Sequence, residues 1–195
     1  VAIAATTQIE DQGLTIGRSA ALLAGLPRSV PGFAIDRMCA GAMTAVTTVA
    51  SGIAFGAYDV AIAGGVEHMG NHPMGEGVDP HPRFVADKLV DPAALVMGST
   101  AENLPDRYPS LTKQRTDAYA ALSQQRYAEA AKAGKIAADL VPVSLRSSEQ
   151  GWGLATEDEP PRPETTVEGL SGLKTPFRPH GRVTPGNAAG LNDGA

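Results

Sequence analysis

The chain's single cysteine, Cys39, is the residue whose type and position could do covalent chemistry. It stands in the stretch IDRMCAGAMTAV, where an extended segment meets a run with helical spacing. A thiol at the first turn of a helix faces unpaired backbone N–H groups and the positive end of the helix dipole, and both favour the thiolate. The small residues Ala40 and Gly41 leave room for an acyl group. The stretch therefore predicts a cysteine nucleophile, and the alternative is an inert thiol packed in the core.

A helix terminus is too weak to activate such a thiol alone. It contributes about 0.3–1 kcal/mol, which lowers a thiol pKa of ~8.5 by roughly one unit, and burial acts in the opposite direction. A general base is therefore needed. The histidines are His68, His72, His81 and His180. None has a carboxylate partner that the sequence alone can assign, so we expect the base to lie outside this chain.

A metal centre is not expected. His68 and His72 are four residues apart, a spacing that suits two metal ligands on a helix, but Gly70 and Pro73 in the same segment argue against a helix there. One cysteine forms neither a cysteine clamp for zinc nor an intramolecular disulfide. The cysteine count therefore favours a reducing compartment, and we expect a cytoplasmic protein.

The composition of the chain limits the kinds of partner that it is expected to bind. The 195 residues are 43% hydrophobic and carry a formal net charge of −5, enough for one core with a smaller lobe. No basic stripe with interleaved aromatic residues is visible, so nucleic acid and anionic membranes are not expected partners. Glu10, Asp11 and Arg18 interrupt the first residues, which do not resemble a signal peptide. Because the chain opens on Val1 and stops in a Gly-rich phrase, we interpret it as a piece of a longer protein.

The run from Met38 to Tyr58 has no charged side chain and is long enough to cross a membrane. Its three Gly, three Thr and one Ser, together with many Ala and Val residues, make it poorly suited to lipid. We therefore expect a helix that is buried on all sides in the core of a soluble protein, with Cys39 at its buried N-terminus.

The elements that would position Cys39 follow an α/β pattern. Apolar runs predict strands at residues 1–5, 31–37 and 59–65, and helical spacing predicts helices at 14–24 and 39–56. The expected core stripe of the second helix is Ala42, Ala45, Val46, Val49, Ala50 and Ile53. Strands that alternate with helices favour a parallel sheet.

The chain changes character after Met69. Residues 70–82 are irregular and rich in proline and glycine, and a helical lobe follows. Ser99 and Glu102 have the spacing of a capping box, so a helix is expected to start at about Thr100 and to end or kink early at Pro105. Thr112 is expected to cap a long helix to about residue 133, and residues 157–166 should form a solvated loop.

Five ordered motifs give the chain a resemblance to a known family. The stretch DRMCAGAMTAV, followed by DVAIAGGVEHMGNHPM, resembles the nucleophile segment of the thiolases. The motifs MGSTAENL, RTDAYAALSQQRYAEAAKAGKI and RPETTVEGLSGLKTPF resemble the thiolase loop domain, and GRVTPGNAAGLNDGA resembles its return to the core. The resemblance covers essentially the whole chain.

The resemblance implies a fold and its domains. We expect a thiolase-like layered α/β/α fold, here as an incomplete N-terminal half, with a mainly helical loop domain inserted. Residues 1–66 and 183–195 would belong to the α/β core, and residues 67–182 would form the loop domain, a lid that binds coenzyme A. Thiolases are usually dimers or tetramers, so a homodimer or homotetramer is expected.

The resemblance also implies a reaction. Cys39 would carry the acyl group, and its own backbone N–H would help to hold the thioester oxygen. The enzyme would cleave a 3-ketoacyl-CoA with coenzyme A, or run the reverse Claisen condensation, with coenzyme A as a substrate and no bound cofactor. The family's asparagine motif, Gly-His-Pro motif and second cysteine belong to its C-terminal half, which we expect to lie outside this chain.

Three further residues match family positions that touch substrate. Met97 corresponds to the methionine that lines the acyl and pantetheine pocket, and its alternative role is packing at the start of a helix. Arg162 corresponds to a position that contacts CoA phosphates in some thiolases, and its alternative role is that of a solvated loop arginine. Ala189 stands where acetoacetyl-CoA thiolases have a serine that meets the pantetheine.

The substrate is expected to be longer than acetoacetyl-CoA. Val96 and Ala189 replace a histidine and a serine that are common in the short-chain enzymes, which favours a degradative thiolase for longer or bulkier acyl chains. A short-chain acetoacetyl-CoA thiolase and a non-catalytic thiolase-like carrier of acyl-CoA or lipid remain alternatives. A decarboxylating condensing enzyme is disfavoured because the lobe after Met97 resembles that of thiolases.

Overall fold

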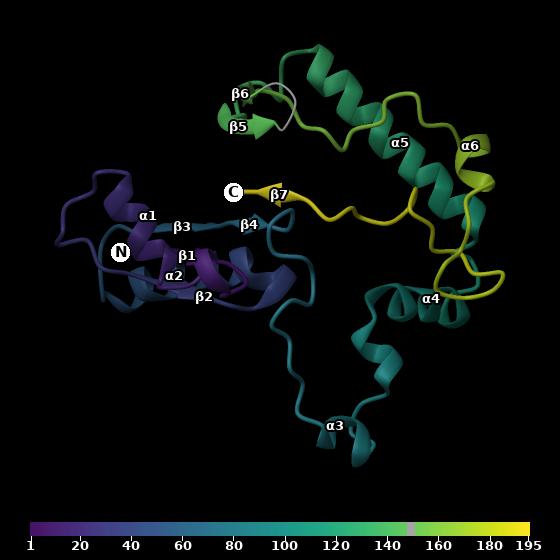
Figure 1. Cartoon of the computed structure of the whole chain (residues 1–195), viewed down its shortest axis with the longest axis horizontal. Coiled ribbons are helices and arrows are strands. Elements are labelled where there is room, and N and C mark those ends of the chain that lie inside the picture. The colour runs from purple at the N-terminus through teal and green to yellow at the C-terminus, as the bar shows by residue number, and fades with distance from the viewer. Residues whose placement is uncertain (148–150) are drawn as a thin grey trace. The chain divides into compact units, whose positions relative to one another are not determined.

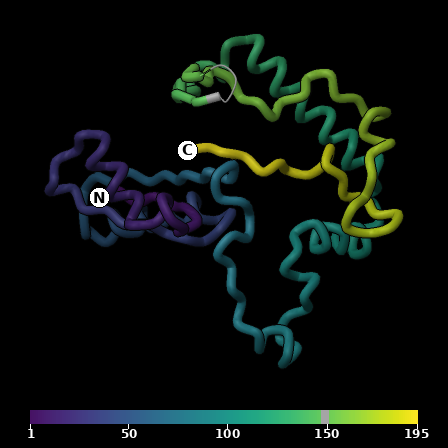
Figure 2. Tube along the Cα trace, viewed as in Figure 1, coloured from purple at the N-terminus to yellow at the C-terminus, as the bar shows by residue number. Residues whose placement is uncertain are grey.

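The computed structural model describes residues 1–147 and 151–195, which divide into two compact units (Figure 1). The first unit contains residues 1–79 together with 191–195, and the second contains residues 80–190. The trace leaves the first unit once and returns to it with its last residues (Figure 2). The expected division between a core and a loop domain 67–182 remains a prediction about the domains of the whole protein.

A three-stranded parallel sheet forms the centre of the first unit. Strands β1 (Ala2–Ala5), β2 (Gly32–Ile35) and β3 (Ile62–Gly65) pair in the order β2-β1-β3, and Ala5 lies opposite both Ile35 and Gly65. All three strands therefore end at one edge of the sheet. The predicted strands and their parallel pairing are confirmed, although each strand is shorter than its apolar run.

Two helices cover opposite faces of this sheet. Helix α1 (Ile16–Leu23) approaches β1 through Gly17, where an added Cβ atom would lie 2.7 Å from the Ala4 backbone nitrogen. Helix α2 (Gly41–Phe55) lies on the other face, where Ala45 and Val49 pack around Ile3. Since successive side chains of a strand point to opposite faces, β1 is enclosed between the two helices.

The expected core stripe of α2 was only partly right. The buried residues of the helix are Gly41, Ala45 and Val49, whereas Val46 and Ile53 are exposed. Apolar residues surround most of α2, so periodicity could not identify the face that packs. The face in contact is the one whose small residues allow the closest approach, since a Cβ at Gly41 would lie 2.8 Å from the Ala5 Cβ.

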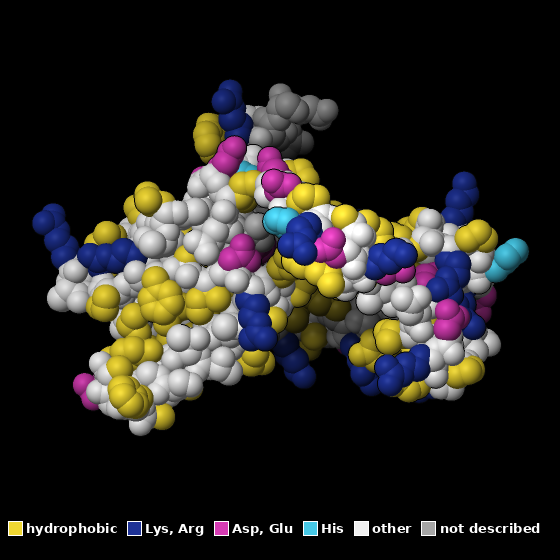
Figure 3. Space-filling model, turned by 90° about the horizontal axis from the view of Figure 1, so that it is seen from below, with side chains coloured by type: hydrophobic (Ala, Val, Ile, Leu, Met, Phe, Trp, Pro, Cys, Tyr) yellow, Lys and Arg dark blue, Asp and Glu magenta, His cyan; other side chains and the backbone are white. Residues whose placement is uncertain are grey.

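The prediction that α2 is buried on all sides was wrong for this structure. By length and composition alone, residues 38–55 could also cross a membrane, a test that core helices of soluble proteins pass equally. One side of α2 packs on the sheet and the other side is apolar and exposed. Large apolar side chains also reach the surface elsewhere in the chain (Figure 3).

Short elements complete the first unit. A 3₁₀ helix, η1 (Glu10–Gln12), follows β1, and a second, η2 (Met38–Ala40), precedes α2. Strand β4 (Glu67–His68) pairs antiparallel with β7 (Asp193–Gly194). This pairing joins the last residues of the chain to the segment that follows β3.

The second unit is mainly helical, as expected. Its elements are α3 (Arg83–Ala86), η3 (Pro92–Leu95), α4 (Met97–Arg107), α5 (Lys113–Lys132), β5 (Val143–Ser147), β6 (Gly151–Ala155) and α6 (Val167–Ser171). The Thr112 hydroxyl accepts a hydrogen bond from the Arg115 backbone N–H, which confirms the predicted cap of α5. The antiparallel pairing of β5 with β6 has no counterpart in our sequence prediction.

Helix α4 departs from the expected capping box. It begins at Met97, so Ser99 lies inside the helix, and it continues past Pro105 to Arg107. The Glu102 side chain is 1% exposed and accepts hydrogen bonds from the backbone N–H groups of Arg182 and Val183. The carboxylate that suggested a cap therefore anchors the returning chain within the second unit.

Candidate active site

Cys39 lies in η2, immediately before helix α2. The turn is tight, since Met38 has a φ of 49° and its backbone N–H donates to the Asp36 carboxylate at 3.3 Å. The Cys39 residue is exposed. The expectation of a thiol at a buried helix tip was therefore wrong in two respects, because the cysteine precedes the α-helix proper and lies at the surface.

A pocket of about 400 Å³ adjoins this cysteine at the edge of the sheet where the parallel strands end. It is lined by Ala5, Thr6, Met38, Cys39, Ala42, Gly65, Val66, Glu67 and residues 192–195. Thr6 follows β1, Met38 follows β2, and Val66 follows β3, so all three strands contribute to the pocket. Ligands of parallel α/β sheets bind at this edge.

Glu67, on β4, lines this pocket, and its carboxylate accepts two hydrogen bonds. One carboxylate oxygen accepts the Thr7 backbone N–H at 2.5 Å, and the other accepts the Gln12 side-chain amide at 3.3 Å. Gln12 itself is 3% exposed. Two walls of the pocket, the segments after β1 and β3, are thus connected through one buried amide.

Glu67 and Gln12 were not predicted as site residues from the sequence. A usable signal existed for Glu67, which stands two residues after the end of β3, at the edge of the parallel sheet where Thr6 follows β1. For Gln12 there was no comparable signal, because its side chain reaches across 55 residues of sequence to Glu67.

The other three predicted site residues lie in the second unit. Met97 is the first residue of α4 and its side chain is 67% exposed, so packing at the helix start does not explain it. The Arg162 guanidinium donates to the carbonyl groups of Glu159 and Pro161, within its own loop. Ala189 is exposed in the segment that leads back to the first unit. Their roles toward substrate remain predictions.

The histidine pair is not arranged as a metal site. His72 is 6% exposed, and its Nε2 and Nδ1 atoms contact the carboxylates of Asp11 and Glu76 at 2.6 and 3.1 Å. The hydrogen bond to Asp11 raises the pKa of His72, against the effect of burial, and it lowers the pKa of Asp11. Within residues 1–147 and 151–195, no group of three potential ligands could hold a metal ion.

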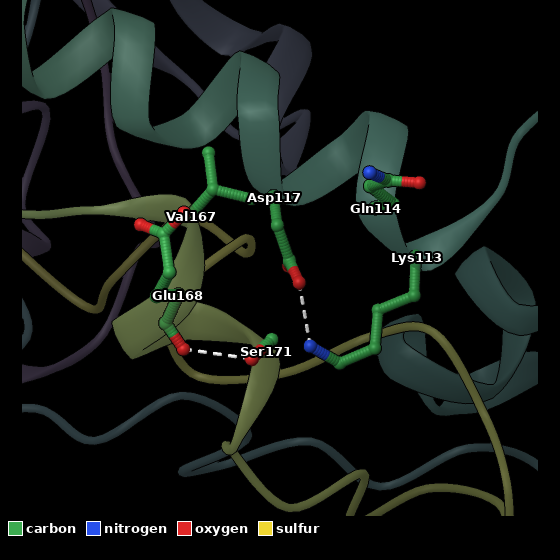
Figure 4. Close-up of a pocket in the computed structure, with 6 residues that line it drawn as sticks. All are labelled: Lys113, Gln114, Asp117, Val167, Glu168 and Ser171. Atoms are coloured by element: carbon green, nitrogen blue, oxygen red, sulfur yellow. Dashed lines mark hydrogen bonds and ion pairs between the residues drawn. The ribbon is translucent and has the colours of Figure 1, made fainter.

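A second pocket, of about 340 Å³, lies in the second unit between α5 and α6 (Figure 4). Lys113 points toward Asp117 there, and its ammonium donates to that carboxylate at 2.6 Å and to the Leu170 carbonyl at 2.8 Å. The Ser171 hydroxyl donates to the Glu168 carbonyl. Of these bonds, the one from Lys113 to the Leu170 carbonyl joins the two helices, so we assign this pocket to structure rather than to chemistry.

Comparison with known families gives the chain its place. The family model described as thiolase, N-terminal domain, matches residues 1–195. This chain belongs to the thiolase family. The parallel sheet with a helix on each face is the corresponding part of the thiolase α/β fold.

Named thiolases are similar in sequence over nearly the whole chain. A 3-ketoacyl-CoA thiolase of Cronobacter sakazakii is 43% identical over 189 residues, which cover 96% of this chain and 48% of that protein. A beta-ketoadipyl-CoA thiolase of Pseudomonas aeruginosa is 39% identical over 210 residues, which cover 100% of this chain and 52% of that protein. The chain thus spans about half the length of these thiolases.

Solved thiolase structures are similar as well. The Bacillus anthracis acetyl-CoA acetyltransferase matches with a TM-score of 0.78 and 34% identity, over 98% of this chain and 50% of that one. The human mitochondrial 3-ketoacyl-CoA thiolase matches with a TM-score of 0.81 and 28% identity, over 98% and 51%. The chain therefore has the fold of a thiolase N-terminal half.

Proposed function

We propose that the full-length protein is a 3-ketoacyl-CoA thiolase in which Cys39 carries the acyl group. The observation that supports this most directly is the position of Cys39 beside a pocket at the carboxyl edge of a parallel sheet. The thiolase family membership gives this cysteine its expected role as nucleophile. The thiol is exposed to the pocket, so a substrate can reach it.

The reaction begins with attack of the Cys39 thiolate on the keto carbon of the substrate. The bond between this carbon and the α-carbon breaks, the α-carbon takes a proton, and acetyl-CoA leaves. The shortened acyl chain stays on sulfur as a thioester until the thiol of a second coenzyme A attacks it and releases the new acyl-CoA. Ping-pong kinetics follow, because one product leaves before the second substrate reacts.

The local structure suits the acyl-enzyme step. Ala5, Ala42 and Gly65 line the pocket with small groups, which leaves space for an acyl chain beside the sulfur. Helix α2 begins two residues after Cys39, and the partial positive charge at its N-terminus would stabilise the thioester oxygen as it gains negative charge. The groups that transfer protons are expected in the C-terminal half of the full-length protein, as in other members of the thiolase family.

Residues of the second unit are proposed to bind coenzyme A. The exposed Met97 side chain would contact the pantetheine or the acyl chain, and Arg162 would bind a phosphate. Because the Arg162 guanidinium now donates to two backbone carbonyl groups, a phosphate would have to compete with them. We propose acyl chains longer than acetoacetyl, in keeping with Val96 and Ala189, and a cytoplasmic homodimer or homotetramer.

Substitution of the nucleophile in the full-length enzyme tests this function. Cys39→Ala should lower kcat for thiolysis of a 3-ketoacyl-CoA at least ~10³-fold, because the covalent intermediate can no longer form. Ser51→Ala, a change on the exposed side of α2, should leave kcat within about twofold of wild type. If the wild-type enzyme binds acyl-CoA without turnover, the protein is a carrier and the proposal is wrong.

A further inference from the structure

Gln12 is a buried polar side chain near the Cys39 pocket, and the thiolase reaction, as described, gives it no role. Its amide group is fully used. The nitrogen donates to the Thr7 carbonyl at 3.0 Å and to the Glu67 carboxylate at 3.3 Å, and the oxygen accepts the His68 backbone N–H at 2.6 Å. One side chain on η1 therefore holds the segments that follow two different strands.

The backbone ladder between β1 and β3 ends before Thr7 and Glu67. The pairing of β1 with β3 ends at Ala5 and Gly65, and one further bond joins the Val66 N–H to the Ala5 carbonyl. One residue further along, the Glu67 carboxylate takes the place of a ladder partner for the Thr7 N–H, at 2.5 Å. Gln12 holds that carboxylate from the other oxygen. The side chains of Glu67 and Gln12 thus join the segments that follow β1 and β3, beside the Cys39 pocket.

Thr6 and Glu67 line the same pocket as Cys39, so the Gln12 network fixes the separation of two of its walls. We propose that Gln12 is a positioning residue for acyl transfer, acting through Glu67 rather than by touching substrate. This inference rests on the proposed thiolase function. A catalytic group or an acyl chain displaced by a fraction of an ångström reacts more slowly, so loss of this network should lower kcat.

Other charged groups near the pocket already have partners of their own. Asp36 accepts the Met38 N–H, and Asp193 accepts the Gly70 N–H at 2.8 Å. The Arg37 guanidinium donates to the Thr44 hydroxyl. Among these, the Glu67 carboxylate is the one that Gln12 holds, so the effect of a Gln12 substitution should depend on Glu67.

The test compares variants of the full-length enzyme. Gln12→Met keeps the length of the side chain but removes its hydrogen bonds, and the same change at the exposed Gln8 is the matched control. Gln12→Met should lower kcat about tenfold with a smaller effect on KM, and Gln8→Met should change neither. In a Glu67→Ala background, Gln12→Met should cost less than about threefold, because residues that act through one contact are not additive.

Two results in the kinetics would overturn the inference. One is a folded Gln12→Met enzyme with wild-type kcat, and the other is an equal loss in the wild-type and Glu67→Ala backgrounds. If Gln12→Met fails to fold, Gln12→Glu gives the same test. That variant keeps the acceptor for the His68 N–H but sets two carboxylates against each other, so it should lose more kcat than tenfold.

A second readout separates this inference from the thiolase proposal. Iodoacetamide alkylates Cys39 whether or not the enzyme performs thiolysis. At one fixed pH, Gln12→Met should change the alkylation rate at least about threefold relative to Gln8→Met, within the range seen for coupled residues. An inactive wild-type enzyme would refute the thiolase proposal alone, whereas an unchanged alkylation rate would refute the role of Gln12.

Discussion

His72 and Asp11, 61 residues apart in sequence, meet at 2.6 Å between the imidazole Nε2 and a carboxylate oxygen. The second ring nitrogen of His72 lies 3.1 Å from Glu76. A nearly buried imidazole between two carboxylates is stabilised in its charged form. This contact attaches the segment after β4 to η1, the same short helix that carries Gln12.

The pH dependence of stability should report this contact. The pKa of His72 is raised by its bond to Asp11, so its contribution is complete below the unfolded value of about 6.5 and is lost as the pH rises through the folded value. The pKa of Asp11 is lowered, so its contribution is present above the unfolded value of 3.8 and is lost as the pH falls through the folded value. The contact should stabilise most between about pH 4 and 6.5.

Thermal melting of His72→Gln against wild type measures this effect. The difference in Tm should be largest near pH 6 and should shrink as the pH rises through the raised pKa of His72 and the imidazole loses its charge. Exposed His81 gives a matched control, and His81→Gln should show no such pH dependence. A Tm difference that is constant from pH 5 to pH 9 would contradict the charged contact.

Glu102 should be essential for the stability of the second unit. Its buried carboxylate accepts the backbone N–H of Arg182 at 2.8 Å and that of Val183 at 2.7 Å. Glu102→Ala leaves these donors unsatisfied, and urea unfolding should show a loss of about 2–4 kcal/mol. The exposed Glu164→Ala should stay within about 0.5 kcal/mol. Equal effects of the two substitutions would refute the anchoring role.

Two substitutions of Asn187 should differ in how much they destabilise the second unit. Its amide nitrogen donates to Asp117 at 2.9 Å, and its amide oxygen accepts the Thr184 N–H at 2.8 Å. Asp117 is 1% exposed. Asn187→Asp would set a second carboxylate against it, so it should destabilise more than Asn187→Ala, by roughly 3 kcal/mol or more relative to wild type. The reverse order in urea unfolding would contradict this network.

A side chain at Gly17 should destabilise the first unit, because α1 touches the sheet there. An added Cβ would lie 2.5 Å from the Phe33 carbonyl oxygen and 2.7 Å from the Ala4 nitrogen, and both are backbone atoms that cannot turn away. Gly17→Ala should cost about 1–3 kcal/mol despite the better helix propensity of alanine. Ala20→Ser, on the exposed side of α1, is the control for urea unfolding. A stabilised Gly17→Ala protein would refute the close contact.

Local patterns predicted the sheet and several helix ends. The three strands around Ile3 were visible because short apolar runs alternated with helical spacing, and the Thr112 cap was visible because its partner lies three residues away. The buried face of α2 could not be predicted, because apolar residues lie on most sides of this helix. The role of Glu102 was misread because its partners lie 80 residues away.

The candidate site, like the fold, could be predicted only where local sequence carried the signal. Cys39 could be selected from its position between a strand and a helix, and the family motifs strengthened that choice. The carboxylate and amide that connect the pocket walls, Glu67 and Gln12, depend on contacts between segments far apart in sequence. A single sequence does not indicate such contacts. The exposure of Cys39 was also mispredicted, because the sequence of α2 alone does not show how much of this helix the rest of the protein covers.

The most direct measurement of the central proposal is the mass of the enzyme after reaction. Full-length protein is mixed with a 3-ketoacyl-CoA in the absence of free coenzyme A, quenched in acid and digested for peptide mass spectrometry. The account predicts that the peptide containing Cys39 gains the mass of the shortened acyl group, that acetyl-CoA is released in equal amount, and that added coenzyme A removes the adduct. An active enzyme in which Cys39 stays unmodified under these conditions would contradict it.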